Sequence, residues 1–154
     1  MSGTALDGLA EAIRALVPES GELHRSAEML LSDPGGYLLL LDLQTQLAAR
    51  IGNRPVDLPA GLYIYAGSAR GPGGVRARLG RHLRGDGKKR WHIDQVTAHA
   101  NGRAGFDYSG LTECELIERL WGSGFFRLPA AGFGSSDCRT CKSHFLQFVP
   151  GGSG

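Results

Sequence analysis

The sequence has no apolar run that approaches the roughly 20 residues needed to cross a bilayer. It also lacks a basic N-terminal start followed by an apolar secretory segment. These two absences predict a soluble, cytoplasmic protein without a membrane partner. The chain of 154 residues, 42% of them hydrophobic, is long enough for one core and too short for two comfortable ones. We therefore expect one main globular domain.

Cysteine is scarce, and the odd count of three argues against a disulfide framework and for reduced thiols or a metal site. Cys138, Cys141 and His144 have the spacing of metal ligands, and Cys114 is a candidate for a fourth position. Three thiolates and one imidazole would make a closed structural zinc site. The competing interpretation is that a short Cys-x-x-Cys arises by chance and that Cys114 is a small buried hydrophobe. We favour the second interpretation.

The sequence has no large excess of one charge, since it contains 17 basic and 15 acidic residues and its net charge is +2. The basic residues are nevertheless concentrated, with eight Lys or Arg and one acid, Asp86, between Arg70 and Arg90. One face of the protein is therefore expected to be strongly positive, and a phosphate-rich polymer is its natural partner. For residues 84–90 the alternative is a solvated loop.

Residues 1–33 are predicted to form an N-terminal helical extension. Apolar residues from Leu6 to Leu16 recur at spacings of three and four, and Pro18 ends the pattern. Further apolar residues between Leu23 and Leu31 indicate a second, weaker helix.

A cluster of breakers at 32–36 opens the core domain, which we expect to span 34–150 before a flexible tail at 151–154. Four segments are predicted strands: 37–43, 46–51, 62–66 and 145–149. The second of these is expected to pair with the first across a tight turn, so that short connections give three antiparallel strands. Tyr63 and Tyr65 share one face of their strand because side chains alternate.

Glycines at 71, 73 and 74 allow a close approach of the backbone to a ligand and precede a predicted helix. Its buried stripe repeats at intervals of four: Val75, Leu79 and Leu83. Arg78 and His82 fall on the adjoining stripe, where a charge can be oriented at the edge of the core. The other arginines of this helix point outward and suit backbone phosphates: Arg76, Arg81 and Arg84.

A later segment predicts a capped helix with a carboxylate on its apolar face. Thr112 and Glu115 match a capping box, which occupies Glu115 with the helix start. Glu113 then shares a face with Ile117 and Leu120, so its carboxylate points toward the core. A carboxylate there needs a cation or an arginine as its partner. Glu113 is therefore the best candidate for a metal ligand.

The order of these motifs resembles the GIY-YIG nuclease superfamily, and in particular its small Uri-type branch. The resemblance runs from Gly35-Gly36-Tyr37 through Tyr65-Ala66-Gly67, Arg78 with His82, and Glu113, and covers about residues 34 to 149. The middle isoleucine of both signature tripeptides is replaced, by Gly36 and by Ala66.

The resemblance implies a compact α+β domain with a central three-stranded antiparallel sheet flanked by helices. It also implies a divalent-metal-dependent DNA endonuclease, with Glu113 holding Mg²⁺ or Mn²⁺ and Arg78 binding the scissile phosphate. Tyr37 and Tyr65 would position or deprotonate water, and we favour Tyr37 as the base. His82 would hydrogen-bond a tyrosine or a phosphate.

Residues around the basic segment are the candidates for DNA contacts: Ser68, Arg70, Arg76, Arg81, Arg84, Lys88, Lys89, Arg90 and His92. His92 and Asp94 either orient the site or contact DNA, or they belong to a capped helix start beside a packed Trp91. Nothing in the sequence resembles a helix that reads the major groove, so single-stranded, flexible or branched DNA is the expected substrate. The alternative function is a noncatalytic nucleic-acid-binding module with a structural Cys/His zinc site.

Overall fold

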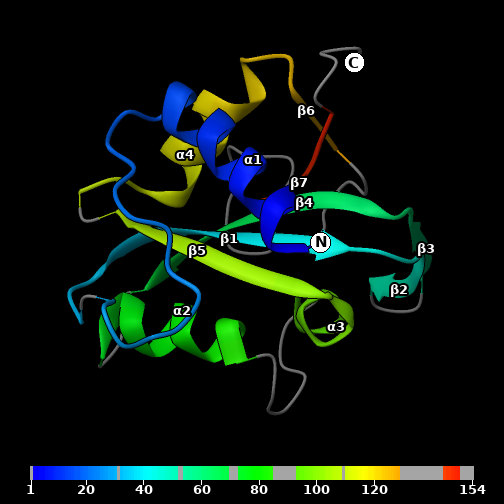
Figure 1. Ribbon diagram of the computed structural model, residues 1–154, viewed down its shortest axis with the longest axis horizontal. Helices are drawn as coiled ribbons and strands as arrows, with labels where there is room; N and C mark the ends of the chain where they lie inside the picture. The colour runs from blue at the N-terminus through cyan, green and yellow to red at the C-terminus, as the bar shows by residue number, and fades with distance from the viewer. Residues whose placement is uncertain are drawn as a thin grey trace.

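A five-stranded antiparallel sheet lies at the centre of the computed structural model, which describes residues 2–30, 32–51, 54–69, 73–84, 93–108, 110–128 and 144–149 (Figure 1). Its strand order is β5-β1-β4-β7-β6. The strands span Gly35–Leu43 (β1), Gly61–Ala69 (β4), Gly102–Tyr108 (β5), Phe126–Arg127 (β6) and Phe145–Phe148 (β7). The antiparallel α+β architecture is confirmed, and the sheet is larger than the three strands expected.

Helices cover both faces of this sheet. Figure 1 shows α1 (Ser2–Leu16) and α4 (Glu113–Trp121) on one side, and α2 (Gly74–Arg84) and α3 (Ile93–His99) on the other. Strand β1 lies between β4 and β5 in the middle of the sheet, and this explains its continuous run of leucines. A strand buried on both faces needs apolar side chains at every position.

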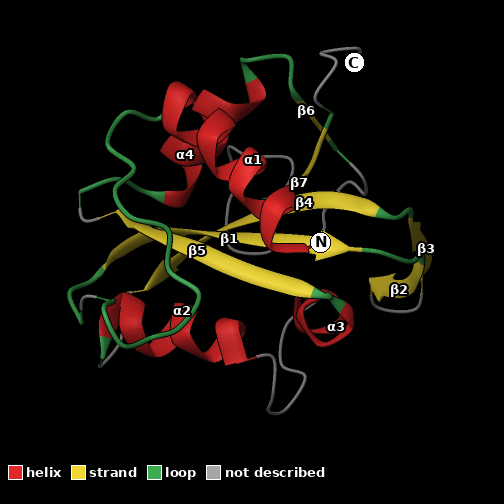
Figure 2. Cartoon of the chain, viewed as in Figure 1, coloured by secondary structure: helices red, strands yellow, loops and turns green. Residues whose placement is uncertain are grey.

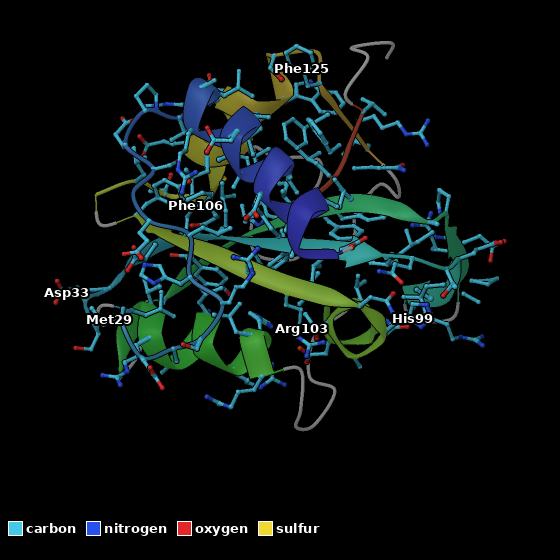
Figure 3. All side chains as sticks on the ribbon, viewed as in Figure 1. Met29, Asp33, His99, Arg103, Phe106 and Phe125 are labelled. Carbon is cyan, nitrogen blue, oxygen red and sulfur yellow. The ribbon has the colours of Figure 1, made fainter. Side chains whose placement is uncertain are left out.

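Two apolar cores result, one on each face of the sheet. Leu38 and Leu40 pack with α1 and α4, whereas Leu39 and Leu41 pack with α2 and α3. The same alternation in β5 directs Phe106 toward the α1 face and Arg103 toward the α2 and α3 face (Figure 3). The two faces therefore hold separate sets of side chains.

The predicted pairing of residues 46–51 with the first strand is wrong. Strand β2 (Leu47–Ile51) pairs with β3 (Arg54–Leu58), and the two form a separate two-stranded sheet. Both edges of β1 are already hydrogen-bonded, to β4 on one side and to β5 on the other. Strand β1 therefore has no free backbone groups left for a third strand, and the hairpin of β2 and β3 lies outside the main sheet.

The N-terminal region holds one helix rather than two. The helix of the first 16 residues is confirmed, but residues 18–30 form turns and an extended segment (Figure 2). Within this segment His24 pairs with Gly105 through two backbone hydrogen bonds of 2.7 and 2.8 Å. The segment therefore covers the outer edge of β5, whose exposed backbone groups compete successfully with a weak helical pattern.

The remaining predicted elements are confirmed. Helix α2 buries Val75, Leu79 and Leu83, and β7 matches the predicted final strand. Helix α4 begins with the Thr112–Glu115 capping box. Among the helices in the described part of the chain, each is too short or too polar to cross a membrane.

Candidate functional site

Three aromatic rings meet on the α2 face of the sheet, close to the start of β1. The ring centroid of Tyr37 lies 6.4 Å from that of Tyr65 and 5.9 Å from that of His82. The centroids of Tyr65 and His82 are 6.0 Å apart. The structure thus brings together the two tyrosines and the histidine that the sequence singled out.

Strand register explains how the Tyr37 ring fits there. Tyr37 on β1 lies opposite Gly67 on β4. A Cβ atom at position 67 would collide with the ring and hydroxyl of Tyr37. The absence of a side chain at Gly67 therefore provides the space for the Tyr37 ring, which is 1% exposed.

His82 links Tyr37 to a buried ion pair. Its Nε2 lies 3.2 Å from the Tyr37 hydroxyl, and its Nδ1 lies 3.8 Å from Oδ1 of Asp94. Arg81 donates two hydrogen bonds to the Asp94 carboxylate, at 2.9 and 3.0 Å. Asp94 is 6% exposed in the first turn of α3. The side chains thus form a row from Tyr37 through His82 and Asp94 to Arg81.

Burial shifts both titratable groups at the inner end of this row. It lowers the pKa of His82 from 6.5 to about 4, against the raising effect of Asp94 and with the help of Arg81 and Arg78. Burial also raises the pKa of the Tyr37 phenol well above its usual range, and Tyr65 adds to this rise. At neutral pH the imidazole is therefore uncharged, and Asp94 favours a proton on Nδ1. Nε2 is then the acceptor for the Tyr37 hydroxyl.

Arg78 lies at the exposed border of this cluster. Its Nη1 donates a 2.6 Å hydrogen bond to the carbonyl oxygen of Ser68, near the end of β4. Arg76 and Arg84 are exposed on the same helix, as predicted. Arg81 differs from its prediction as an outward-pointing residue, because its side chain is 20% exposed and bonded to Asp94. A carboxylate buried in α3 draws its guanidinium inward.

Glu113 stands in a second group, on α4 and therefore across the sheet. One oxygen of its carboxylate, Oε2, is buried and has no hydrogen-bond partner among the described residues. Sγ of Cys114 lies 3.8 Å from Nε2 of His144. A ligand atom from each of these three residues lies within 4.8 Å of the others. An orphaned carboxylate oxygen beside sulfur and nitrogen donors is a fitting environment for a cation.

The two groups lie at the same end of the sheet. The Gly36 amide donates a 3.0 Å hydrogen bond to the carbonyl oxygen of Leu111, directly before α4. Tyr37 follows Gly36 in the sequence, and Glu113 comes two residues after Leu111. A Cβ atom at Gly36 would lie only 2.6 Å from the Leu111 oxygen, so glycine permits this contact. One backbone contact therefore connects the strand of Tyr37 to the helix of Glu113.

Several candidates from the sequence lie outside the described residues: Arg70, Lys88, Lys89, Arg90, His92, Cys138 and Cys141. Ser68 is half-buried on β4, and its carbonyl oxygen accepts the hydrogen bond from Arg78. The sequence did not indicate that Glu113 joins Cys114 and His144, since it assigned them to two different metal sites. The adjacency of Glu113 and Cys114 in the sequence could have indicated a shared site. His144, however, comes 30 residues after Cys114, and no local pattern connects it to them.

A family model for a domain of unknown function, DUF123, matches residues 36–150. A comparison with curated proteins and another with solved structures each found no match. The matched segment begins one residue before Tyr37 and includes both side-chain groups described above. The chain belongs to the DUF123 family.

Proposed function

We propose that this protein is a divalent-metal-dependent DNA endonuclease of GIY-YIG type, related to the Uri-type branch. Its expected substrates are single-stranded, flexible or branched DNA. Two lines support the proposal: the order of the motifs in the sequence, and the grouping of Tyr37, Tyr65 and His82 beside Arg78. The observation that carries it is the contact between the Tyr37 hydroxyl and a neutral His82.

Hydrolysis of a phosphodiester needs a base for water and positive charge on the phosphate. A buried phenol with a raised pKa is a poor base by itself. His82 offers a route, because its Nε2 can take the hydroxyl proton of Tyr37 while the Tyr37 oxygen takes a proton from water; burial disfavours the imidazolium that forms, and Asp94 favours it. The resulting hydroxide attacks phosphorus while the bond from phosphorus to the leaving sugar oxygen breaks. The leaving oxygen takes a proton from solvent, and the imidazolium, which faces Asp94, then releases its proton to restore neutral His82.

Arg78 supports the other half of the reaction. Its guanidinium is at the surface and oriented by Ser68, so a phosphate can reach it without desolvating the core. The carboxylate of Glu113 fits a divalent cation, since its Oε2 is buried without a hydrogen-bond partner in the described part of the chain. A cation bound there would supply positive charge to the non-bridging phosphate oxygens.

Cleavage assays with Mg²⁺ or Mn²⁺ on single-stranded, duplex and branched DNA test the proposal. We expect Arg78→Ala and Glu113→Gln each to lower the cleavage rate by about 100-fold or more, with DNA binding changed far less. Glu118→Gln is the matched control at an exposed position of α4 and should cleave nearly normally, whereas Arg76→Ala, at an exposed position of α2, should weaken DNA binding more than it slows cleavage of bound DNA. Undiminished cleavage in either site variant would contradict the assigned site.

The same assay separates the two tyrosines. Tyr37→Phe removes the hydroxyl that contacts His82 and should abolish cleavage, whereas Tyr65→Phe should retain more of it. Tyr63→Phe is the control, because the Tyr63 hydroxyl bonds the carbonyl of Pro59 instead. An active Tyr37→Phe enzyme rules out Tyr37 as the base.

The second candidate function, a noncatalytic nucleic-acid-binding module, is favoured by one contact, between Cys114 and His144. A thiol and an imidazole at this distance suit a structural metal as well as a catalytic one. The module predicts DNA binding that falls with salt, and no cleavage with any divalent cation.

A further inference from the structure

We propose that Glu113, Cys114 and His144 together bind a zinc-type cation through one oxygen, one sulfur and one nitrogen atom. This deepens the proposed function and rests on it in one respect, because Glu113 is the metal ligand in both. The binding itself can be measured without DNA. Failure of the nuclease and failure of this site are therefore distinguishable.

The spacing of the donor atoms fits such an ion. In a tetrahedral site, zinc lies about 2.3 Å from sulfur and about 2.0 Å from imidazole nitrogen, which puts these two atoms roughly 3.5 Å apart. Sγ of Cys114 and Nε2 of His144 are 3.8 Å apart, too far for a strong hydrogen bond. The carboxylate of Glu113 completes a set whose members all lie within 4.8 Å of one another.

The surroundings of these atoms also call for a cation. His144 is 4% exposed, and Glu113 and Cys114 are both half-buried. The buried Glu113 Oε2 has no hydrogen-bond partner among the described residues, which costs free energy unless a cation compensates it. A direct bond to a metal would satisfy this oxygen.

Local structure fixes the three residues before any ion binds. Glu113 and Cys114 occupy the first turn of α4, where the Thr112–Glu115 capping box engages the neighbouring carboxylate of Glu115. His144 is held by a 2.8 Å hydrogen bond from the amide of Ala66 to its carbonyl. The backbone of these ligands is already hydrogen-bonded, in a capped helix and beside β4, so less order is lost on binding than from a free loop.

The donor set discriminates between metals. Mg²⁺ takes oxygen ligands in an octahedron and keeps several waters, whereas thiolate and imidazole suit Zn²⁺ and Co²⁺. Zn²⁺ should therefore bind here far more tightly than Mg²⁺. The carboxylate of Glu113 taken alone suits Mg²⁺ or Mn²⁺, whereas the full set of three donors favours Zn²⁺.

The test uses the full-length chain after chelation, titrated with Zn²⁺ against a chromophoric chelator. We expect one zinc per chain, not displaced by millimolar Mg²⁺. Even the outer partners of metal ligands change affinity by about 10- to 100-fold, so the loss of a ligand should weaken binding by at least tenfold. Glu113→Gln, Cys114→Ser and His144→Gln should each show this loss, and Glu118→Gln and His99→Gln should not.

Two measurements on the wild-type chain keep the proposal testable if a variant does not fold. Co²⁺ should give a near-ultraviolet thiolate charge-transfer band. One equivalent of Zn²⁺ should slow alkylation of Cys114 by tenfold or more, as read from the peptide that contains it, and Mg²⁺ should not. Equal alkylation rates with and without zinc, or unchanged affinity in all three site variants, would overturn the site. Zinc binding without DNA cleavage would contradict only the nuclease.

Discussion

His82 is a titratable residue that is only 2% exposed. Its burial lowers its pKa from 6.5 to about 4, so the folded protein keeps it neutral where the unfolded chain takes up a proton. Charged groups act on it from two helices, with Asp94 raising the pKa and Arg81 and Arg78 lowering it. The stabilisation that depends on a neutral imidazole is complete above pH 6.5 and is lost as the pH falls toward 4.

The lowered pKa of His82 predicts that the folded protein loses stability in acid because of this one residue. Between pH 6.5 and pH 4, the free energy of unfolding should fall by about 3 kcal/mol because of His82 alone. Urea denaturation at a series of pH values measures it. His82→Gln should be less stable at pH 7 but should lose less stability on acidification, whereas His99→Gln should follow the wild type. Parallel pH curves for wild type and His82→Gln would contradict a neutral, buried imidazole.

At the scale of elements, two glycines in regular structure should respond in opposite ways to the same substitution. Gly8 lies exposed within α1, and a Cβ atom there would meet no other atom within 4 Å. Gly67 lies within β4, where a Cβ atom would collide with the Tyr37 ring. Alanine at position 8 should stabilise the protein, because it reduces the conformational freedom of the unfolded chain. Alanine at position 67 should destabilise it, because the packed Tyr37 ring would have to move.

We expect Gly8→Ala to stabilise the protein by about 0.5 to 1 kcal/mol and Gly67→Ala to destabilise it by about 1 to 3 kcal/mol. Chemical denaturation followed by circular dichroism gives both values. Gly67→Ala should also change the near-ultraviolet signal of the tyrosines, because the Tyr37 ring moves away from His82. A neutral Gly67→Ala would mean that the ring has more room than the register of β1 and β4 allows.

For the whole molecule, α1 is part of the core rather than an appendage. Leu6, Leu9, Ile13 and Val17 are each at most 2% exposed and pack into the same cluster as the sheet and α4. Burying each such side chain contributes about 1.5 to 3 kcal/mol, and the sum is comparable to the total stability of a domain. Helix α1 therefore shares one apolar core with the sheet and α4.

Deleting residues 1–17 should consequently abolish cooperative unfolding and expose the sheet, as measured by thermal melting and by binding of a hydrophobic dye. The milder change Ile13→Ala should cost about 2 to 5 kcal/mol. Glu11→Ala, at an exposed position of the same helix that forms a surface ion pair with Arg14, should cost less than about 1 kcal/mol. A truncated chain that melts cooperatively at the wild-type temperature would show that α1 is dispensable.

Local patterns in the sequence predicted most helices and strands, because periodicity, glycines and the capping box act over a few neighbouring residues. Strands β3, β5 and β6 were not predicted, and two predictions were wrong where distant backbone groups competed. Residues 46–51 found the edges of β1 occupied, and the segment around His24 paired with β5 instead of forming a helix. The same limit applies to the candidate site, where the sequence suggested a tyrosine as a partner of His82 but did not indicate that Asp94 lies beside His82 or that Glu113 joins Cys114 and His144.

The sequence by itself determined which side chains are present and which of them share one face of a strand or helix, because those periods are fixed by backbone geometry. Only the tertiary structure decided which faces meet. Packing of α2 and α3 brought Asp94 beside His82, and packing of α4 against β1 and β4 brought Glu113 and Cys114 to His144, which directly precedes β7. Contacts between residues far apart in sequence depend on strand order and burial, which no local pattern encodes.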